Sequence, residues 1–337
     1  MIDFKQFLTT IAAIFLALAV GVALGAGPLK GTAGEQLRNQ VNQLAKDKDE
    51  LHQQLLDQQA QAKYREAFAV QVGQKLVAGR LDGRKVLMIA LPGADSATVK
   101  AIRELVADAG GAVTGTVTIE DKLLDPTQTQ FVDDVSSQAV ASVTATDLGI
   151  PATATGYQRA GYVLGRALMT KGIGVQDDAA RTILYAFKDR SAGLITAPDR
   201  LERAQLAIAV AGPPASTGDT ARDVKGTVAL LRGLRSQGDG LVLAGPPSAA
   251  GSGGVISAVR SNGAAEEAIS TVDEANLASG QVVSVLALVE QAQGGSGQYG
   301  GVGTTDGVVP PFPARPSPLP TPTPTKSSSP RPHAPSR

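Results

Sequence analysis

The hydrophobic pattern begins with one uncharged stretch near the N-terminus. Residues 9–29, TTIAAIFLALAVGVALGAGPL, contain no charged side chain, and the nearest charges on either side are Lys5 and Lys30. A helix of roughly 20 apolar residues is long enough to cross the hydrocarbon core of a bilayer. The pattern therefore predicts a transmembrane helix over residues 9–29, after a short tail of residues 1–8. A cleaved signal peptide is the alternative, because the stretch ends in small residues.

A heptad pattern follows from Leu37 onward. Apolar residues recur there at alternating steps of four and three, which is the spacing of a coiled coil. We expect a coiled coil over residues 35–81 that joins copies of the chain into a homo-oligomer. Lys48 within the seam lowers stability but can fix the register. The alternative is a lone amphipathic helix packed on its own domain. The predicted seam consists of Leu37, Val41, Leu44, Lys48, Leu51 and Leu55.

Residues 82–293 have the pattern of an α/β domain. A buried type of strand at residues 85–91 is followed by an amphipathic helix that ends near Asp108, and by a second strand at residues 112–119. This strand–helix–strand order is typical of a parallel sheet with right-handed crossovers. The sequence thus predicts a Rossmann-like globular domain.

The same order returns later in the chain. Strands are predicted at residues 205–211 and 241–244, on either side of a helix at about residues 219–235. Between the two strand–helix–strand units, residues 126–193 carry helical patterns and are expected to form a helical insertion. The remaining predicted elements are a helix at residues 255–260, a strand at 268–272 and an apolar helix at 281–293.

The last part of the chain is rich in Gly and then in Pro, Ser and Thr. Such a composition buries too little apolar surface to offset the entropy of ordering. We therefore expect a disordered tail over residues 294–337.

Composition and charge narrow the range of possible functions. The 31 basic and 31 acidic residues balance, so nothing in the net charge indicates nucleic-acid binding. The absence of Cys excludes disulfides, zinc–thiolate sites and cysteine nucleophiles. A short N-terminal tail before a long C-terminal region favours a single-pass protein of the cell membrane, with the C-terminal domain extracytoplasmic. The expected partners are the membrane, other copies of the chain and an envelope protein.

Candidate catalytic groups are few. The two histidines are His52, in the predicted coil, and His333, in the predicted tail, so a Ser–His–Asp arrangement is not available in the folded domain. Asp133–Asp134 and Asp177–Asp178 are adjacent pairs, and neighbours on a helix point about 100° apart, which favours capping and solvent contacts over an acid/base dyad. We predict no catalytic, cofactor-binding or metal-binding residue, no cofactor and no enzymatic activity.

Several short runs carry a family resemblance. They are FLALAVGVALG at residues 15–25, GGAVTGTV at 110–117, ISTVD at 269–273, the helix at 282–288 and GQYG at 297–300. In this order, the runs resemble the actinobacterial copper transport protein family over residues 1 to about 303. The resemblance implies a role in copper homeostasis that limits intracellular copper, in a family assigned as a channel of the outer membrane.

The residue types favour an anchored oligomer over a pore. Cu(I) prefers the sulfur of Cys and Met, yet the chain has no Cys, and Met88 and Met169 fall in predicted core segments. A barrel channel needs many strands of about ten alternating residues with aromatic girdles, and aromatic residues are only 4% of this chain. The alternative function is a non-enzymatic envelope scaffold that oligomerises through its coiled coil and binds a partner or a cell-wall polymer.

Overall fold

The computed structural model describes most of the chain, in two compact units. The first unit covers residues 1–68 and the second covers residues 69–337. The predicted tail beyond residue 311 and the first three residues lie outside the described part. The described residues are 4–26, 29–141, 149–151, 153–154, 156–172, 176–189, 191–215, 223–303 and 305–311.

Two helices account for the first unit. Helix α1 (Phe4–Ala26) contains an apolar stretch, Gln6–Gly25, that is long enough to cross a membrane, and none of it is buried. Helix α2 (Leu29–Val77) is strongly polar and continues into the second unit. It ends four residues before the predicted limit of the coil at residue 81, because Gly79 takes a left-handed backbone conformation (φ 70°) that terminates a helix.

The second unit is built on one seven-stranded sheet in the order β3-β2-β1-β4-β5-β6-β7. All neighbouring strands are parallel except β3, which is antiparallel to β2. The strands are β1 (Lys85–Ala90), β2 (Ala112–Ile119), β3 (Ile195–Thr196), β4 (Leu206–Val210), β5 (Gly240–Ala244), β6 (Ser270–Val272) and β7 (Gln298–Tyr299). The strands predicted near residues 85, 112, 205, 241 and 268 are therefore confirmed, whereas β3 and β7 were not predicted.

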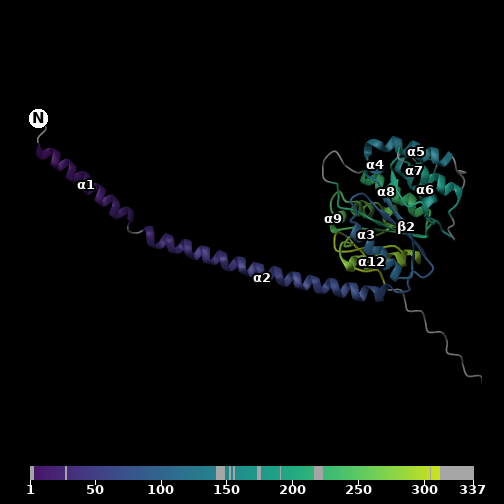
Figure 1. Cartoon of the computed structure of the whole chain (residues 1–337), viewed down its shortest axis with the longest axis horizontal. Helices are drawn as coiled ribbons and strands as arrows, with labels where there is room; N and C mark the ends of the chain where they lie inside the picture. The colour runs from purple at the N-terminus through teal and green to yellow at the C-terminus, as the bar shows by residue number, and fades with distance from the viewer. Residues whose placement is uncertain are drawn as a thin grey trace, which may run out of the picture. The chain divides into compact units, whose positions relative to one another are not determined.

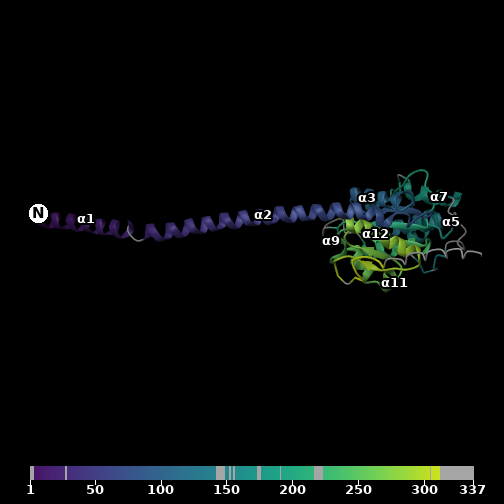
Figure 2. The same cartoon turned by 90° about the horizontal axis from the view of Figure 1, so that it is seen from below.

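Helices cover both faces of the sheet. Side chains alternate along β1: Val86 and Met88 enter one core, and Leu87 and Ile89 enter the other. The first core packs against α3 (Ser96–Asp108), α12 (Ala278–Ala292) and the end of α2, and the second packs against the helices of the insertion (Figure 1). Figure 2 shows α3 and α12 from a second direction. The sheet is consequently buried on both sides, as its continuous apolar strands predict.

The helical insertion lies on the second face. It contains α4 (Asp121–Leu124), a 3-10 turn at Pro126–Gln128, α5 (Thr129–Ala141), α6 (Gly156–Leu168) and α7 (Asp178–Lys188). Helix α6 packs closely on α8 (Val224–Ser236), where glycines let the two backbones approach. The remaining short helices are α9 (Pro247–Ala250), α10 (Val255–Arg260) and α11 (Gly263–Glu266).

One prediction requires correction. The disordered tail was expected from residue 294, yet residues 298–299 form strand β7 of the sheet, where Gln298 and Tyr299 are almost fully buried. Gly294, at φ 86°, turns the chain back after α12. The strand could not be predicted from composition, because two residues are too few to show a hydrophobic period. The polar groups of these two residues are also satisfied only by partners from distant parts of the chain.

Candidate functional site

The described residues contain no ready-made metal site. No group of three or more His, Cys, Asp or Glu among them could hold a metal ion. His52 lies exposed on α2, and His333 lies outside the described residues. Both Met88 and Met169 have no exposed surface, so their sulfur atoms are packed in the core as their positions predict. Within the described part, nothing is arranged as a copper ligand set.

The predicted seam residues lie on α2 with their side chains exposed. Relative exposure is 62% for Leu37, 59% for Val41, 73% for Leu44, 65% for Leu51 and 50% for Leu55. Lys48 is also exposed. A row of half-exposed Leu and Val side chains on one helix face is the arrangement that a partner helix would bury. The structure holds a single chain, so the pairing itself stays a prediction.

The acidic pairs act as the sequence suggests. Asp177 caps α7 by accepting a hydrogen bond from the Ala180 backbone N–H. Asp178 forms an ion pair with Arg181 one turn away on the surface. Asp133 lies 2.7 Å from Arg159 and accepts from the Gly156 N–H at the start of α6, whereas Asp134 accepts from Gln130. Neither pair converges as a dyad.

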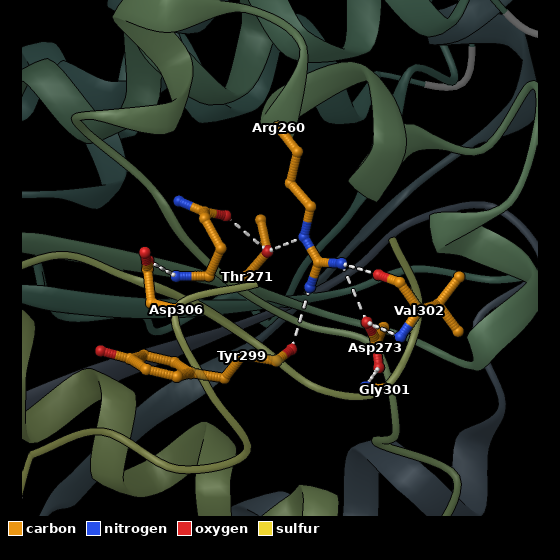
Figure 3. Close-up of polar contacts among 8 residues, drawn as sticks. Arg260, Thr271, Asp273, Tyr299, Gly301, Val302 and Asp306 are labelled. Carbon is orange, nitrogen blue, oxygen red and sulfur yellow. Dashed lines mark hydrogen bonds and ion pairs between the residues drawn. The ribbon is translucent and has the colours of Figure 1, made fainter. Parts of the chain in front are cut away.

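The most developed polar cluster of the domain surrounds Arg260 at the end of α10 (Figure 3). Its Nε donates to Thr271 Oγ1 at 2.8 Å, and its Nη1 lies 2.9 Å from Asp273 Oδ2. The two terminal nitrogens also donate to the backbone carbonyls of Val302 and Tyr299. We call these residues the Arg260 cluster. One guanidinium thus binds β6, β7 and the turn that follows β7.

Asp273 completes the cluster from the end of β6. Its side chain is fully buried, and it accepts hydrogen bonds from the Gly301 N–H at 2.9 Å and the Val302 N–H at 3.1 Å, in addition to Arg260. A buried charge needs such partners to offset its desolvation. Gly300 is required beside it, because it has φ 135° and a Cβ there would overlap the Asp273 carboxylate.

Strand β7 is held by both of its side chains. Gln298 donates to the Ile269 carbonyl and accepts from Thr271 Oγ1, while Asp306 accepts from the Gln298 backbone N–H. The Tyr299 hydroxyl donates to Glu290 on α12 at 2.7 Å. Burial, together with this hydrogen bond to the carboxylate, raises the pKa of Tyr299 far above its ordinary value.

The Arg260 cluster joins two of the resemblance-bearing runs, and a third packs against β6. The runs at residues 269–273 and 297–300 form β6 and β7, and the run at 282–288 lies on α12 behind them. No buried polar side-chain atom in the described part lacks a partner, so the cluster is a closed structural unit and not an open binding site. The sequence analysis missed Arg260, because its partners Asp273, Tyr299 and Val302 come from distant parts of the chain and no local pattern marks them.

The carboxyl edge of the sheet is the usual ligand site in open parallel sheets. Here the loops after β1 and β4 lie side by side at the point where the strand order reverses. A Cβ on Gly212 would come within 2.8 Å of the Gly93 Cα, so the two loops are in direct backbone contact. The two loops therefore pack against each other at Gly93 and Gly212.

Comparison with known proteins places the chain in a family. Residues 1–310 match the family described as "Copper transport outer membrane protein, MctB". The chain is 30% identical over 309 residues to the copper transporter MctB of Mycobacterium tuberculosis strain H37Rv, covering 89% of this chain and 96% of the relative.

A second relative supports the same assignment. The chain is 31% identical over 323 residues to the copper transporter MctB of Mycobacterium leprae, which covers 92% of this chain and all of the relative. The family match over residues 1–310 includes the apolar helix, the polar helix and the α/β unit. The chain therefore belongs to the MctB family of copper transport outer membrane proteins.

Proposed function

We propose that this protein transports copper in the cell envelope, limiting intracellular copper, as a membrane-anchored homo-oligomer without enzymatic activity. The observation that carries the proposal is the family match over residues 1–310, which includes both the apolar helix and the folded domain. Relatives covered almost completely by the chain are named copper transporters.

The anchor is proposed to be a single transmembrane helix. Twenty consecutive residues, Gln6–Gly25, are apolar enough to span a bilayer, and their described side chains are exposed in the chain by itself. An exposed apolar helix is stable in lipid and unfavourable in water. We place the short N-terminal tail in the cytoplasm and the α/β domain on the extracytoplasmic side.

Oligomerisation is proposed to occur through α2. Its seam exposes five large apolar side chains, at 50–73% each, and burying one such side chain contributes about 1.5–3 kcal/mol. Lys48 interrupts the apolar row, which is a known device for fixing register and strand number. An oligomer would join several copies of the chain, each with its own α/β domain.

The finer fold assignment also belongs to this proposal. We interpret the second unit as Rossmann-like in the broad sense, because its parallel strands run in the order β2-β1-β4-β5-β6 with helices on both faces. This order reverses between β1 and β4, as in doubly wound sheets. The unit is proposed to serve assembly, because its sheet is covered on both faces by well-packed cores.

The oligomer can be tested on the full chain in detergent by sedimentation equilibrium. Lys48→Leu should strengthen association by placing an apolar side chain in the seam, and Leu44→Asp should weaken it. Lys46→Leu is the matched control, because it makes the same change two residues away, off the seam. A chain that stays monomeric, or equal effects of the changes at positions 46 and 48, would remove the coiled coil from the proposal.

The copper role can be tested in cells that lack the gene. Deletion should raise copper content and copper sensitivity, and the wild-type chain should restore both. A chain carrying Leu44→Asp and Leu51→Asp should fail to restore them if assembly is required. Unchanged copper content and sensitivity after deletion would contradict the transport function.

A further inference from the structure

A pocket of about 530 Å³ opens on the side of the domain where α6 and α8 end, far along the chain from the Arg260 cluster. Its walls are unusually rich in cationic and hydroxyl groups for a chain with no net charge. We call it the α6–α8 pocket. Its polar lining residues include Tyr162, Arg166, Thr170, Lys171, Arg203 and Ser236.

Positive charge exceeds negative charge among the described residues of the pocket. Arg166, Lys171 and Arg203 line it, and the carboxylate within reach of them is Asp177. Asp177 is paired with Arg166 at 2.5 Å, but it lies 4.0 Å from the nearest nitrogen of Arg203. One carboxylate therefore lies near two of the three cations that line the pocket.

The two arginines are held in place and are not loose surface groups. The side chain of Arg166 is 14% exposed and that of Arg203 is 18% exposed. Arg203 Nε donates to the Met169 carbonyl at 3.0 Å. Two backbone hydrogen bonds fix the chain beside Arg203: the Ala204 N–H donates to the Leu168 carbonyl, and the Thr170 N–H donates to the Ala204 carbonyl.

The electrostatic situation is unfavourable without an additional anion. Burial lowers the pKa of Arg203, and the positive charge of Arg166 lowers it further, against the opposite effect of Asp177. Asp177 balances only one of the two guanidinium charges, so the second charge loses hydration and is repelled by the first without a full counter-charge. A bound anion would relieve both costs.

We propose that the α6–α8 pocket binds a phosphoryl-bearing anion through Arg166, Arg203 and Lys171. Guanidinium groups match the oxygens of phosphate in a bidentate geometry, and Lys adds a mobile point charge. The hydroxyl groups of Tyr162, Thr170 and Ser236 add polar contacts to the walls. The pocket is open, so the phosphoryl group can belong either to a soluble molecule or to a phosphodiester polymer of the envelope.

The test is calorimetric titration of the full chain in a neutral detergent. Two probes are used, inorganic phosphate and a short oligomer of glycerol phosphate. We expect saturable binding that weakens with added salt. Binding of the phosphate alone points to a soluble ligand, whereas tighter binding of the oligomer points to a polymer, and either result supports the site.

Three variants locate the binding in the pocket. Arg203→Gln should weaken the affinity by about tenfold or more, because it removes a charge-assisted contact. Lys171→Gln should weaken it without affecting folding, since Lys171 is exposed. Arg159→Gln is the matched control: Arg159 also lies on α6 and pairs with an aspartate at 2.7 Å, but it does not line the pocket.

The same probes and variants also give the result that would contradict the proposal. If neither probe binds the wild-type chain at millimolar concentration, or if Lys171→Gln binds as tightly as Arg159→Gln, the pocket is not an anion site. Circular dichroism of each variant separates loss of binding from loss of fold. If Arg203→Gln does not fold, Lys171→Gln decides the outcome.

Discussion

At the scale of single residues, the domain depends on a buried ion pair. Asp273 is fully buried and Arg260 is 9% exposed, and between them they bind four backbone groups of residues 299–302. Such a pair adds little to the free energy of unfolding compared with a well-packed apolar replacement. Removing one partner is costly, however, because it leaves an uncompensated buried charge. The same asymmetry does not hold for exposed pairs such as Arg181–Asp178.

Arg260→Ala should therefore lower the free energy of unfolding of the domain by about 3–5 kcal/mol. Chemical denaturation of the full chain in detergent, followed by circular dichroism, measures this loss. Arg181→Ala removes an exposed ion pair and should change the stability by less than about 1 kcal/mol. Equal losses from the two changes would show that the Arg260 cluster does not stabilise β7.

Tyr299 makes the stability of the domain depend on pH in the alkaline range. Its pKa is raised in the folded state by burial first and by the hydrogen bond to Glu290 second. The unfolded chain then loses its tyrosine proton at a lower pH than the folded chain does, near the ordinary value of about 10. The contribution of Tyr299 to stability is complete below that pH and is lost as the pH rises above it.

Tyr299→Phe should cost about 1 kcal/mol at pH 7, because it removes one hydrogen bond from a buried cluster. The difference between variant and wild type should shrink as the pH rises above 10. Denaturation midpoints at pH 7, 9 and 11 measure both effects. A difference that grows with pH over this range would have the wrong sign for a raised tyrosine pKa.

At the scale of elements, α6 and α8 show why glycine occurs inside helices of this chain. A Cβ on Gly233 would lie 2.6 Å from the carbonyl carbon of Gly161, which is closer than real side chains approach a backbone. The two helices therefore cross with their backbones in contact. Glycine within a helix costs roughly 1 kcal/mol relative to alanine, and close packing offsets this cost here.

Gly233→Ala should destabilise the domain by about 1–3 kcal/mol, because α6 and α8 must move apart to accommodate the methyl group. Gly263→Ala is the matched control, since a Cβ at that position of α11 meets no atom within 4 Å. Thermal melting of the two variants in parallel measures the contrast. If both melt alike, the helix crossing tolerates the extra atom and the close approach has no energetic consequence.

At the scale of the whole molecule, the chain combines a helical unit with an α/β unit that ends beyond its last helix. The segment after α12 returns to the sheet and supplies Gln298, Tyr299 and the backbone groups at residues 301–302 to the Arg260 cluster. Asp306 binds back to Gln298. The C-terminal boundary of the domain thus depends on contacts that close between residues far apart in the sequence.

Truncation locates this boundary. A chain that ends after Gly297 lacks β7 and leaves Arg260 and Asp273 without several of their partners, so its domain should unfold at a much lower denaturant concentration. A chain that ends after residue 311 keeps all of the described contacts and should match the full chain. Equal stability of the two truncated chains would mean that β7 contributes nothing to the fold.

The sequence by itself determined the features that depend on local pattern. The uncharged stretch at residues 9–29 and the polar helix after it follow from hydrophobicity and helical periodicity, which act within a few turns. The strands β1, β4 and β5 are nearly continuous apolar runs, the pattern of strands buried on both faces, and β2 is marked by its alternating Val and Thr residues. The resemblance to copper transport proteins was also visible in the sequence, and the family match confirms it.

Tertiary structure decided what local pattern could not. Strand β7 is two residues long, and only the partners of Gln298 and Tyr299, contributed by α11, β6 and α12, make it a strand. Arg166 and Arg203 lie 37 positions apart in the sequence, and only the fold brings both into one pocket. The physical reason is the same in both cases: the energy of a buried polar or charged group depends on which distant groups surround it, and no hydrophobic period records those neighbours.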